Sequence, residues 1–213
     1  MKLNRRLIVK RIEPRGTQSE LINRRTLFRR ILPTSRSNPL SVWECISGVV
    51  KKSPGKFQID VLVRKQVAPR LRRVARPAEI VEVLRKLLGE LHVSHGDLCA
   101  VFVDNKEIRR LNKVYRKKDQ ATDVLAFPLG DIRGAHGNDR HLGDIVISVP
   151  TALRQARRLG VSDKEEFSRL LIHGLLHLLG YRHERVAPEV AQRMRRKEQT
   201  LIKLVLGARS MRR

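Results

Sequence analysis

The chain has 213 residues, 41% of them hydrophobic, which is enough for one well-packed domain with an appendage. It carries 46 Lys and Arg against 21 Asp and Glu, and this net charge of +25 favours a polyanionic partner, either nucleic acid or an anionic membrane surface. Aromatic residues make up only 4% of the chain, so any RNA binding should depend on phosphate contacts and weaken strongly with salt, which counts against sequence-specific recognition through base stacking.

The cysteines and the hydropathy of the chain favour a cytoplasmic protein. Cys45 and Cys99 are far apart and belong to no CxxC pair, which argues against a disulfide framework or a cysteine-built metal site. No run of about 18 uncharged apolar residues occurs, and the N-terminus lacks the apolar core of a signal peptide. We therefore expect neither a membrane span nor secretion.

The first quarter of the chain differs in composition from the rest. Residues 1–56 hold 14 Lys or Arg against 3 Asp or Glu and show little continuous apolar pattern, which predicts a basic and mostly disordered extension. It could be a solvated tail, an over-extended start, a functional arm or an organelle-targeting segment. We expect the folded domain over residues 57–206 and a basic tail over residues 207–213.

From Lys56 onward, strand-like and helix-like segments alternate. Strands are predicted where apolar residues alternate or run together, at 56–65, 98–104, 122–129 and 143–149. Helices are predicted from apolar residues at helical spacing, at 77–93, 105–117, 151–160, 162–180 and 186–207. A polar loop at 131–141 separates the last two strands. This order predicts an α+β fold in which one small mixed β-sheet packs with several helices.

Residues 173 to 183, HGLLHLLGYRH, carry three of the seven histidines within eleven residues. His173 and His177 point from one face of a helix on successive turns, about 6 Å apart at Cβ, which suits the binding of one ion. Gly180 can adopt a left-handed conformation and return His183 toward the same ion. Three nitrogen ligands leave a fourth tetrahedral position for water, as in catalytic zinc sites. The HxxxHxxxxxH motif thus predicts a central metal-binding helix; the alternative is three unrelated histidines.

Gly174 stands where zinc proteases of the HExxH type carry a glutamate. That glutamate takes the proton from the zinc-bound water, and glycine cannot do so. Peptide hydrolysis by this route is therefore not supported. A phosphodiester would suit such a site if a cation stood nearby to stabilise the charge that develops on phosphorus.

The motif HGLLHLLGYRH resembles the signature of the YbeY family, bacterial and organellar zinc-dependent endoribonucleases linked to ribosomal RNA maturation. Two further stretches, LNKVYRKKDQATDVLAFP (111–128) and LGDIVIS (142–148), resemble other blocks of that family in the same order. The resemblance covers residues 57–206. It departs from the family pattern at Arg182, where aspartate is usual, and at Ala126, where serine is usual.

The resemblance implies a zinc-dependent, single-strand-specific endoribonuclease acting in ribosomal RNA processing, including maturation of the 16S rRNA 3′ end, and in ribosome quality control. It places the ligands of one zinc ion at His173, His177 and His183, with water as a fourth ligand, and a functional arginine at Arg116. The guanidinium fork of arginine can hold a phosphate through two hydrogen bonds. The implied partners are single-stranded ribosomal RNA and the small ribosomal subunit, without a membrane or a small-molecule cofactor; the oligomeric state is not predicted.

Other interpretations of these residues stay open. The helix geometry alone would also fit a metal-dependent peptidase, and the basic charge would fit a non-catalytic ribosome-binding factor in which zinc only braces the fold. Arg116 could be an ordinary solvated arginine. Asp119 and Asp123 could orient it, although we expect Asp123 to cap a turn. The sequence does not identify the nucleophile or the proton acceptor.

Overall fold

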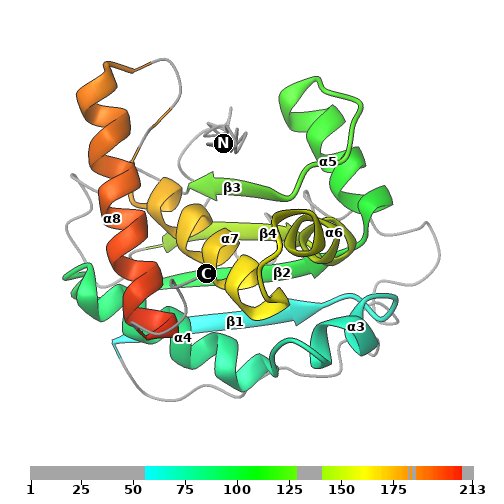
Figure 1. Ribbon diagram of the computed structural model, residues 1–213, viewed down its shortest axis with the longest axis horizontal. Helices are drawn as coiled ribbons and strands as arrows, with labels where there is room; N and C mark the ends of the chain where they lie inside the picture. Colours follow the sequence, from blue (N-terminus) through cyan, green and yellow to red (C-terminus); the bar gives the residue numbers. More distant parts are fainter. Residues whose placement is uncertain (1–55, 129–140, 182, 184–185, 208–213) are drawn as a thin grey trace.

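The computed structural model describes residues 56–128, 141–181, 183 and 186–207. A four-stranded sheet in the order β1-β2-β4-β3 forms its centre (Figure 1). The strands β1 (Phe57–Val63), β2 (Gly96–Val103) and β4 (His141–Ser148) run parallel, and β3 (Val124–Pro128) lies antiparallel to β4 at one edge. The predicted α+β fold with a small mixed sheet is confirmed.

The described residues form six helices around this sheet: α3 (Ala68–Arg72), α4 (Pro77–Glu90), α5 (Asn105–Arg116), α6 (Val149–Leu159), α7 (Asp163–Leu178) and α8 (Pro188–Leu206). Only the five-residue α3 was not predicted, because so short a helix has too few residues to show a period. None of the described helices has the length and apolar character needed to cross a bilayer. The expectations for residues 1–55 and 208–213 and for most of the 131–141 loop lie outside the described residues.

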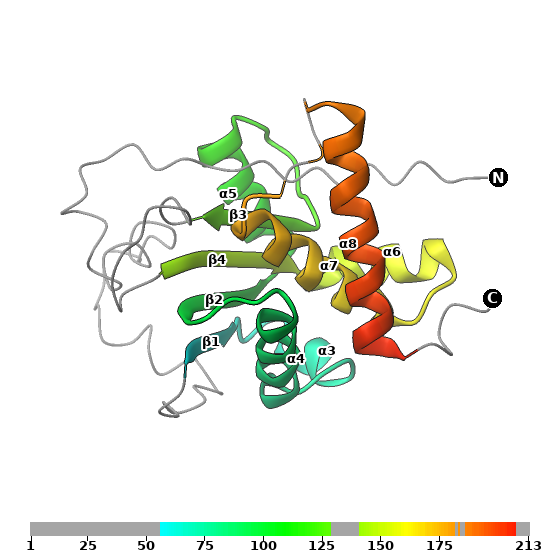
Figure 2. The same cartoon turned by 90° about the vertical axis from the view of Figure 1, so that its left-hand side faces the viewer.

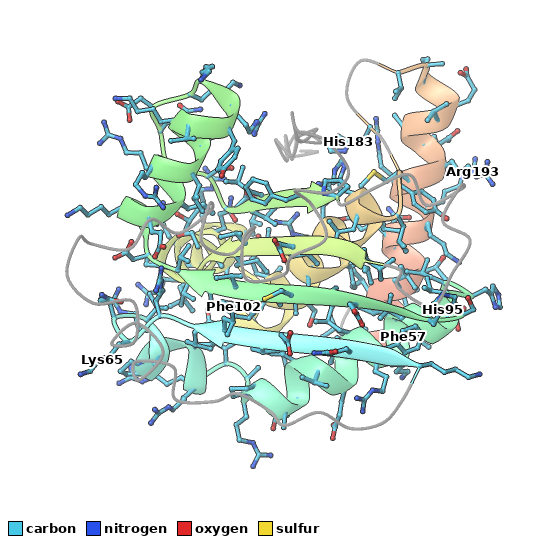
Figure 3. The ribbon with its side chains drawn as sticks, turned by 180° about the vertical axis from the view of Figure 1, so that it is seen from behind. Phe57, Lys65, His95, Phe102, His183 and Arg193 are labelled. Carbon is cyan, nitrogen blue, oxygen red and sulfur yellow. The ribbon has the colours of Figure 1, made fainter. Side chains whose placement is uncertain are left out.

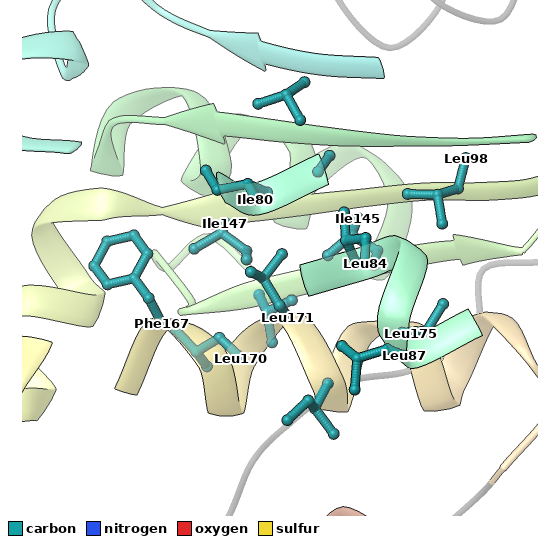
Figure 4. Close-up of a cluster of buried hydrophobic side chains, with 14 of the residues drawn as sticks. Ile80, Leu84, Leu87, Leu98, Ile145, Ile147, Phe167, Leu170, Leu171 and Leu175 are labelled. Carbon is teal, nitrogen blue, oxygen red and sulfur yellow. The ribbon is translucent and has the colours of Figure 1, made fainter. Parts of the chain in front are cut away.

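The two faces of the sheet are covered by different helices. The larger core lies between the sheet and helices α4 and α7, and it contains Leu84, Phe102, Ile145 and Leu171 (Figure 4). The smaller core lies on the opposite face, where α5 contributes Ile108 and packs near β3 and β4 (Figure 2). Because α7 lies between the sheet and α8, it is buried along nearly its whole length. Polar side chains on α7 therefore point into the protein interior.

The ends of α6 and α7 follow from local side-chain chemistry. Ser148 Oγ accepts a hydrogen bond from Thr151 N, so α6 begins directly after β4, two residues earlier than predicted. Ser162 Oγ accepts from Glu165 N at 3.2 Å and caps α7 at the predicted residue. The chain leaves α7 through Gly180, whose φ of 83° is accessible to glycine at little cost. This turn sends the segment after α7 back toward its last turns.

Candidate metal centre

The turn at Gly180 brings three histidine rings together at the C-terminal end of α7. His173 and His177 lie on one face of the helix and are only 2% and 5% exposed. His183 follows the turn and is half-buried. Figure 3 shows it past the β3 edge of the sheet, between α5 on one side and α8 on the other. One ring nitrogen from each of the three histidines lies within 4.8 Å of the others. The structure thus brings together the three histidines that the sequence singled out.

The geometry of this cluster suits a single ion. His173 Nε2 and His177 Nε2 are 3.2 Å apart, and two nitrogens bound to one tetrahedral zinc at 2.0–2.1 Å would lie about 3.3 Å apart. The ring centroids are 4.7 to 5.0 Å apart, with the rings tilted rather than stacked. Imidazole is a ligand that zinc, copper, iron and nickel all accept. The three-histidine group could therefore hold a metal ion.

The surroundings of His177 keep its ring neutral. Burial lowers its pKa to about 2, and the nearby charges of His173, His183 and Arg116 act in the same direction, while a hydrogen bond to the Tyr181 backbone opposes them. Metal ions bind the neutral form of imidazole. At neutral pH the low pKa of His177 therefore leaves its ring in the neutral form that a metal ion binds.

A carboxylate lies on the far side of the His173 ring. Glu198 Oε1, from α8, is 3.2 Å from His173 Nδ1, and the two side chains are 15% and 3% exposed. Glu198 was not predicted from the sequence, although the pattern of α8 contains a signal for it. The apolar face of α8 includes the buried Met194 and Leu201. Glu198 lies four residues after the first and three before the second, so the helical period predicts an apolar side chain at its position.

A second buried charge lies one turn earlier on α7. Arg169 binds Glu166 through both of its carboxylate oxygens, one of them at 2.8 Å from Nε, and the side chains are 7% and 1% exposed. Burial lowers the pKa of Arg169, but the Glu166 hydrogen bonds and the charges of Glu166, Glu198 and Asp123 outweigh this effect, so the net shift is upward. The guanidinium therefore stays charged inside the protein, within the electrostatic reach of Glu198, the carboxylate that contacts His173.

Arg116 is the last residue of α5 and half-buried, and its Nε and Nη2 atoms are shielded from solvent. Its charge acts on His177, which places the guanidinium near the histidine cluster. Asp119 instead binds Arg109 Nε and Lys113 Nζ, at 2.8 and 2.9 Å. The structure thus brings Arg116 close to the three histidines and directs Asp119 toward the outer face of α5.

The side chain of Asp123 is hydrogen-bonded at the start of β3. Its Oδ1 accepts hydrogen bonds from Val124 N and Thr122 Oγ1, and its Oδ2 accepts one from Gln155 Nε2 at 3.1 Å. These bonds hold the start of β3 and tie it to α6. We infer a structural role for Asp123 at the beginning of this edge strand.

Comparison with known proteins identifies the family. The family model described as Endoribonuclease YbeY matches residues 66–205. The chain belongs to the YbeY family. The motifs at 111–128, 142–148 and 173–183 all lie within the matched range. Of the positions where this YbeY chain departs from the family pattern, Ala126 is fully buried in the larger core, and Arg182 lies outside the described residues.

Three relatives named Endoribonuclease YbeY agree with this assignment. Endoribonuclease YbeY of Myxococcus xanthus is 49% identical over 60% of this chain, which spans only 41% of that protein. Endoribonuclease YbeY of Aquifex aeolicus is 47% identical over 55% of this chain and 77% of its own length. The protein of the same name from Syntrophus aciditrophicus is 38% identical over 74% of this chain and 97% of its own. A solution structure from Thermotoga maritima has a TM-score of 0.49 at 24% identity, covering 71% of this chain and 89% of that one.

The glycine that follows the first histidine has a packing role in this YbeY chain. A Cβ at Gly174 would lie 2.6 Å from Ile145 Cγ2 of the central strand β4. The side chain of a glutamate at this position would start against the sheet, inside the larger core. The glycine at this position therefore allows α7 to pack closely on β4, which a glutamate side chain would prevent.

We expect Gly174→Ala to destabilise the protein although it replaces a helical glycine by alanine. Overpacking against Ile145 costs about 1–3 kcal/mol, and the better helix propensity of alanine offsets about 1 kcal/mol of this. The net loss should reach up to about 2 kcal/mol in the free energy of unfolding, measured by urea denaturation.

The matched control is Gly89→Ala in α4, where no atom lies within 4 Å of an added Cβ. Helix propensity alone should then stabilise the protein by about 0.5–1 kcal/mol. If both substitutions stabilised the protein equally, the close packing of Gly174 on Ile145 would have no energetic weight.

Proposed function

We propose that this protein is a zinc-dependent endoribonuclease that cuts single-stranded ribosomal RNA. It acts in the cytoplasm on RNA of the small ribosomal subunit, in maturation of the 16S rRNA 3′ end and in ribosome quality control. Family membership supports the endoribonuclease activity, since the matching family model and the relatives above carry that name. The three-histidine group supports the dependence on a metal ion.

The observation that best supports this proposal is the effect of the Arg116 charge on His177, a member of the three-histidine group, whose pKa it lowers. Among the described arginines, Arg116 is the one whose charge lowers the pKa of His177. It belongs to α5, which covers the face of the sheet opposite to α7. A cation next to a metal centre suits a reaction in which negative charge builds up on phosphorus. A peptidase would need a proton acceptor beside the metal, and Gly174 supplies none.

Each residue of the site has a defined role in this proposal. His173, His177 and His183 would hold the zinc ion, which would supply Lewis-acid chemistry to water and to a phosphoryl oxygen. Arg116 holds a phosphate oxygen of the RNA through its guanidinium fork and stabilises the charge that develops on cleavage. The neutral state of His177 keeps its ring nitrogen available as a ligand.

The charge of the surrounding surface suits an RNA substrate. Helix α5 exposes Arg109 and is followed by the exposed Lys117, and helix α8 exposes Arg193 and Arg196. Contacts between such basic side chains and the phosphates of RNA make the affinity for RNA fall as the salt concentration rises. Few aromatic side chains are present for stacking on bases, so the RNA is held mainly by its backbone.

The deciding experiment compares the zinc-loaded wild-type protein with Arg116→Ala on a single-stranded ribosomal RNA fragment, with and without a chelator. We expect cleavage by the wild type to stop on chelation and return with zinc. Removing the group that stabilises the developing charge should lower the cleavage rate about 100- to 1,000-fold. Arg116→Lys, which keeps the charge without the fork, should retain part of the activity.

The control is Lys113→Ala, which removes one positive charge from the exposed side of the same helix. Its cleavage rate should stay close to that of the wild type, because a single exposed lysine contributes only nonspecific attraction to RNA. Equal losses in the two variants would mean that Arg116 acts through net charge alone. Cleavage that ignores the chelator would contradict the metal-dependent mechanism.

A further inference from the structure

We propose that Glu198 is a positioning residue of the metal centre, which fixes the tautomer and the ring orientation of His173 and so raises the affinity of the three-histidine group for its metal ion. The inference rests on the metal site of the proposed function. It does not depend on RNA cleavage, so the two can be tested separately.

The two nitrogens of the His173 ring have different neighbours. Nδ1 lies 3.2 Å from Glu198 Oε1, and Nε2 lies 3.2 Å from His177 Nε2 within the cluster. An ionised carboxylate only accepts hydrogen bonds, so its partner Nδ1 must carry the proton. The lone pair of Nε2 is then directed at the place where His177 and His183 also offer a nitrogen. A carboxylate that orients a metal-binding histidine in this way also makes the ring more basic.

The position of Glu198 is built into the packing of two helices. Arg169 and His173 lie four residues apart on the same face of α7, one turn from each other, and α8 packs against this helix. The charge of Glu198 raises the pKa of Arg169, which places that guanidinium near the carboxylate. Arg169 binds both oxygens of Glu166, whereas Glu198 Oε1 lies against His173 and experiences the positive charge of Arg169 only at longer range.

The location of Glu198 in α8 also argues for a role beyond stability. It occupies an otherwise apolar stripe, where Met194 and Leu201 on either side are fully buried. Burying a carboxylate at such a position costs free energy unless it is paired. Residues that break a local pattern in this way are expected at functional sites.

The test is the substitution Glu198→Gln, which keeps the shape of the side chain and removes its charge. Zinc affinity, measured by competition with a chromophoric chelator, should fall about 10- to 100-fold. The visible absorption spectrum of the cobalt-substituted protein should also change, because the His173 ring is no longer held in one orientation. Melting of the metal-free protein and its circular dichroism report whether the variant still folds.

The matched control is Glu189→Gln, which removes the same charge from an exposed position in the first turn of α8. Its zinc affinity and cobalt spectrum should match those of the wild type. If Glu198→Gln bound zinc as tightly as the control, the proposal would be overturned. A wild-type protein that binds zinc but leaves RNA intact would contradict the proposed activity and leave the role of Glu198 in place.

A measurement on the wild-type protein keeps the proposal testable even if the variant does not fold. The ring nitrogens of His173 in the metal-free protein can be observed by ¹⁵N NMR, with His173→Asn assigning the signal. We expect a protonated Nδ1 and an unprotonated Nε2. The opposite tautomer would show that Glu198 does not hold His173 in the metal-binding form.

Discussion

Replacement of His177 by alanine is expected to weaken zinc binding by more than about 100-fold, since loss of a direct ligand exceeds the cost of losing a residue that only supports one. The centroid of its ring lies 4.7 Å from that of His173 and 5.0 Å from that of His183, and the residue is 5% exposed. Metal-dependent cleavage of single-stranded RNA should fall below detection. Chelator competition measures the first effect and a gel-based cleavage assay the second.

The control for His177→Ala is His92→Asn. His92 is exposed and has a φ of 54°, a conformation that asparagine also tolerates, so this variant removes a histidine without strain. It should bind zinc and cut RNA like the wild type. If neither protein cut RNA and His177→Ala lowered melting temperature and RNA affinity together, the ribosome-binding factor would be the better interpretation. Metal-dependent degradation of an unfolded protein would instead favour the peptidase.

Glu166→Gln is expected to destabilise the metal-free protein by about 3–5 kcal/mol, because it leaves the buried guanidinium of Arg169 without its bidentate partner. The Glu166 side chain is 1% exposed and that of Arg169 is 7% exposed, so water cannot replace the lost bonds. The charges of Glu198 and Asp123 remain nearby and compensate only in part. Urea denaturation in the presence of a chelator measures the change without a contribution from metal binding.

Two further variants test whether the loss comes from an unpaired charge. Glu166→Leu combined with Arg169→Met should recover much of the stability, since a buried ion pair can often be exchanged for apolar side chains at little cost. Asp163→Asn removes an exposed acidic group from the first turn of the same helix and should cost about 0.3–1 kcal/mol. A loss of similar size in Glu166→Gln would mean that Arg169 does not need Glu166.

The prediction of the fold and of the histidine cluster succeeded where the signal is local. Alternating strand and helix periods were sufficient for the α+β architecture, and the boundaries differ by a few residues where caps such as Ser148 decide them. The three histidines were found because a helical turn and the left-handed Gly180 relate them through backbone geometry alone. The roles of these histidines and of Arg116 stay predictions, as do the domain limits.

The residues that the sequence analysis missed share a different property. Glu198 lies 25 residues from His173 and meets it only because α8 packs on α7. Glu166 and Arg169 are neighbours on one helix, but their burial follows from the position of that helix between the sheet and α8. From the sequence, Gly174 could be recognised as the position where HExxH proteases carry a glutamate. Its close approach to Ile145 could not, because it depends on how closely α7 packs on β4.

By itself, the sequence determined the order of strands and helices, the basic character of the chain and the spacing that lets three histidines face one point. These features depend on periods of the backbone and on conformations of single residues, which neighbouring residues specify. Only the tertiary structure decided which charged residues from other helices act on the histidines: Arg116 from α5 on His177, and Glu198 from α8 on His173. Electrostatic interactions depend on distance and burial, and both are set by the packing of elements that are remote in the chain.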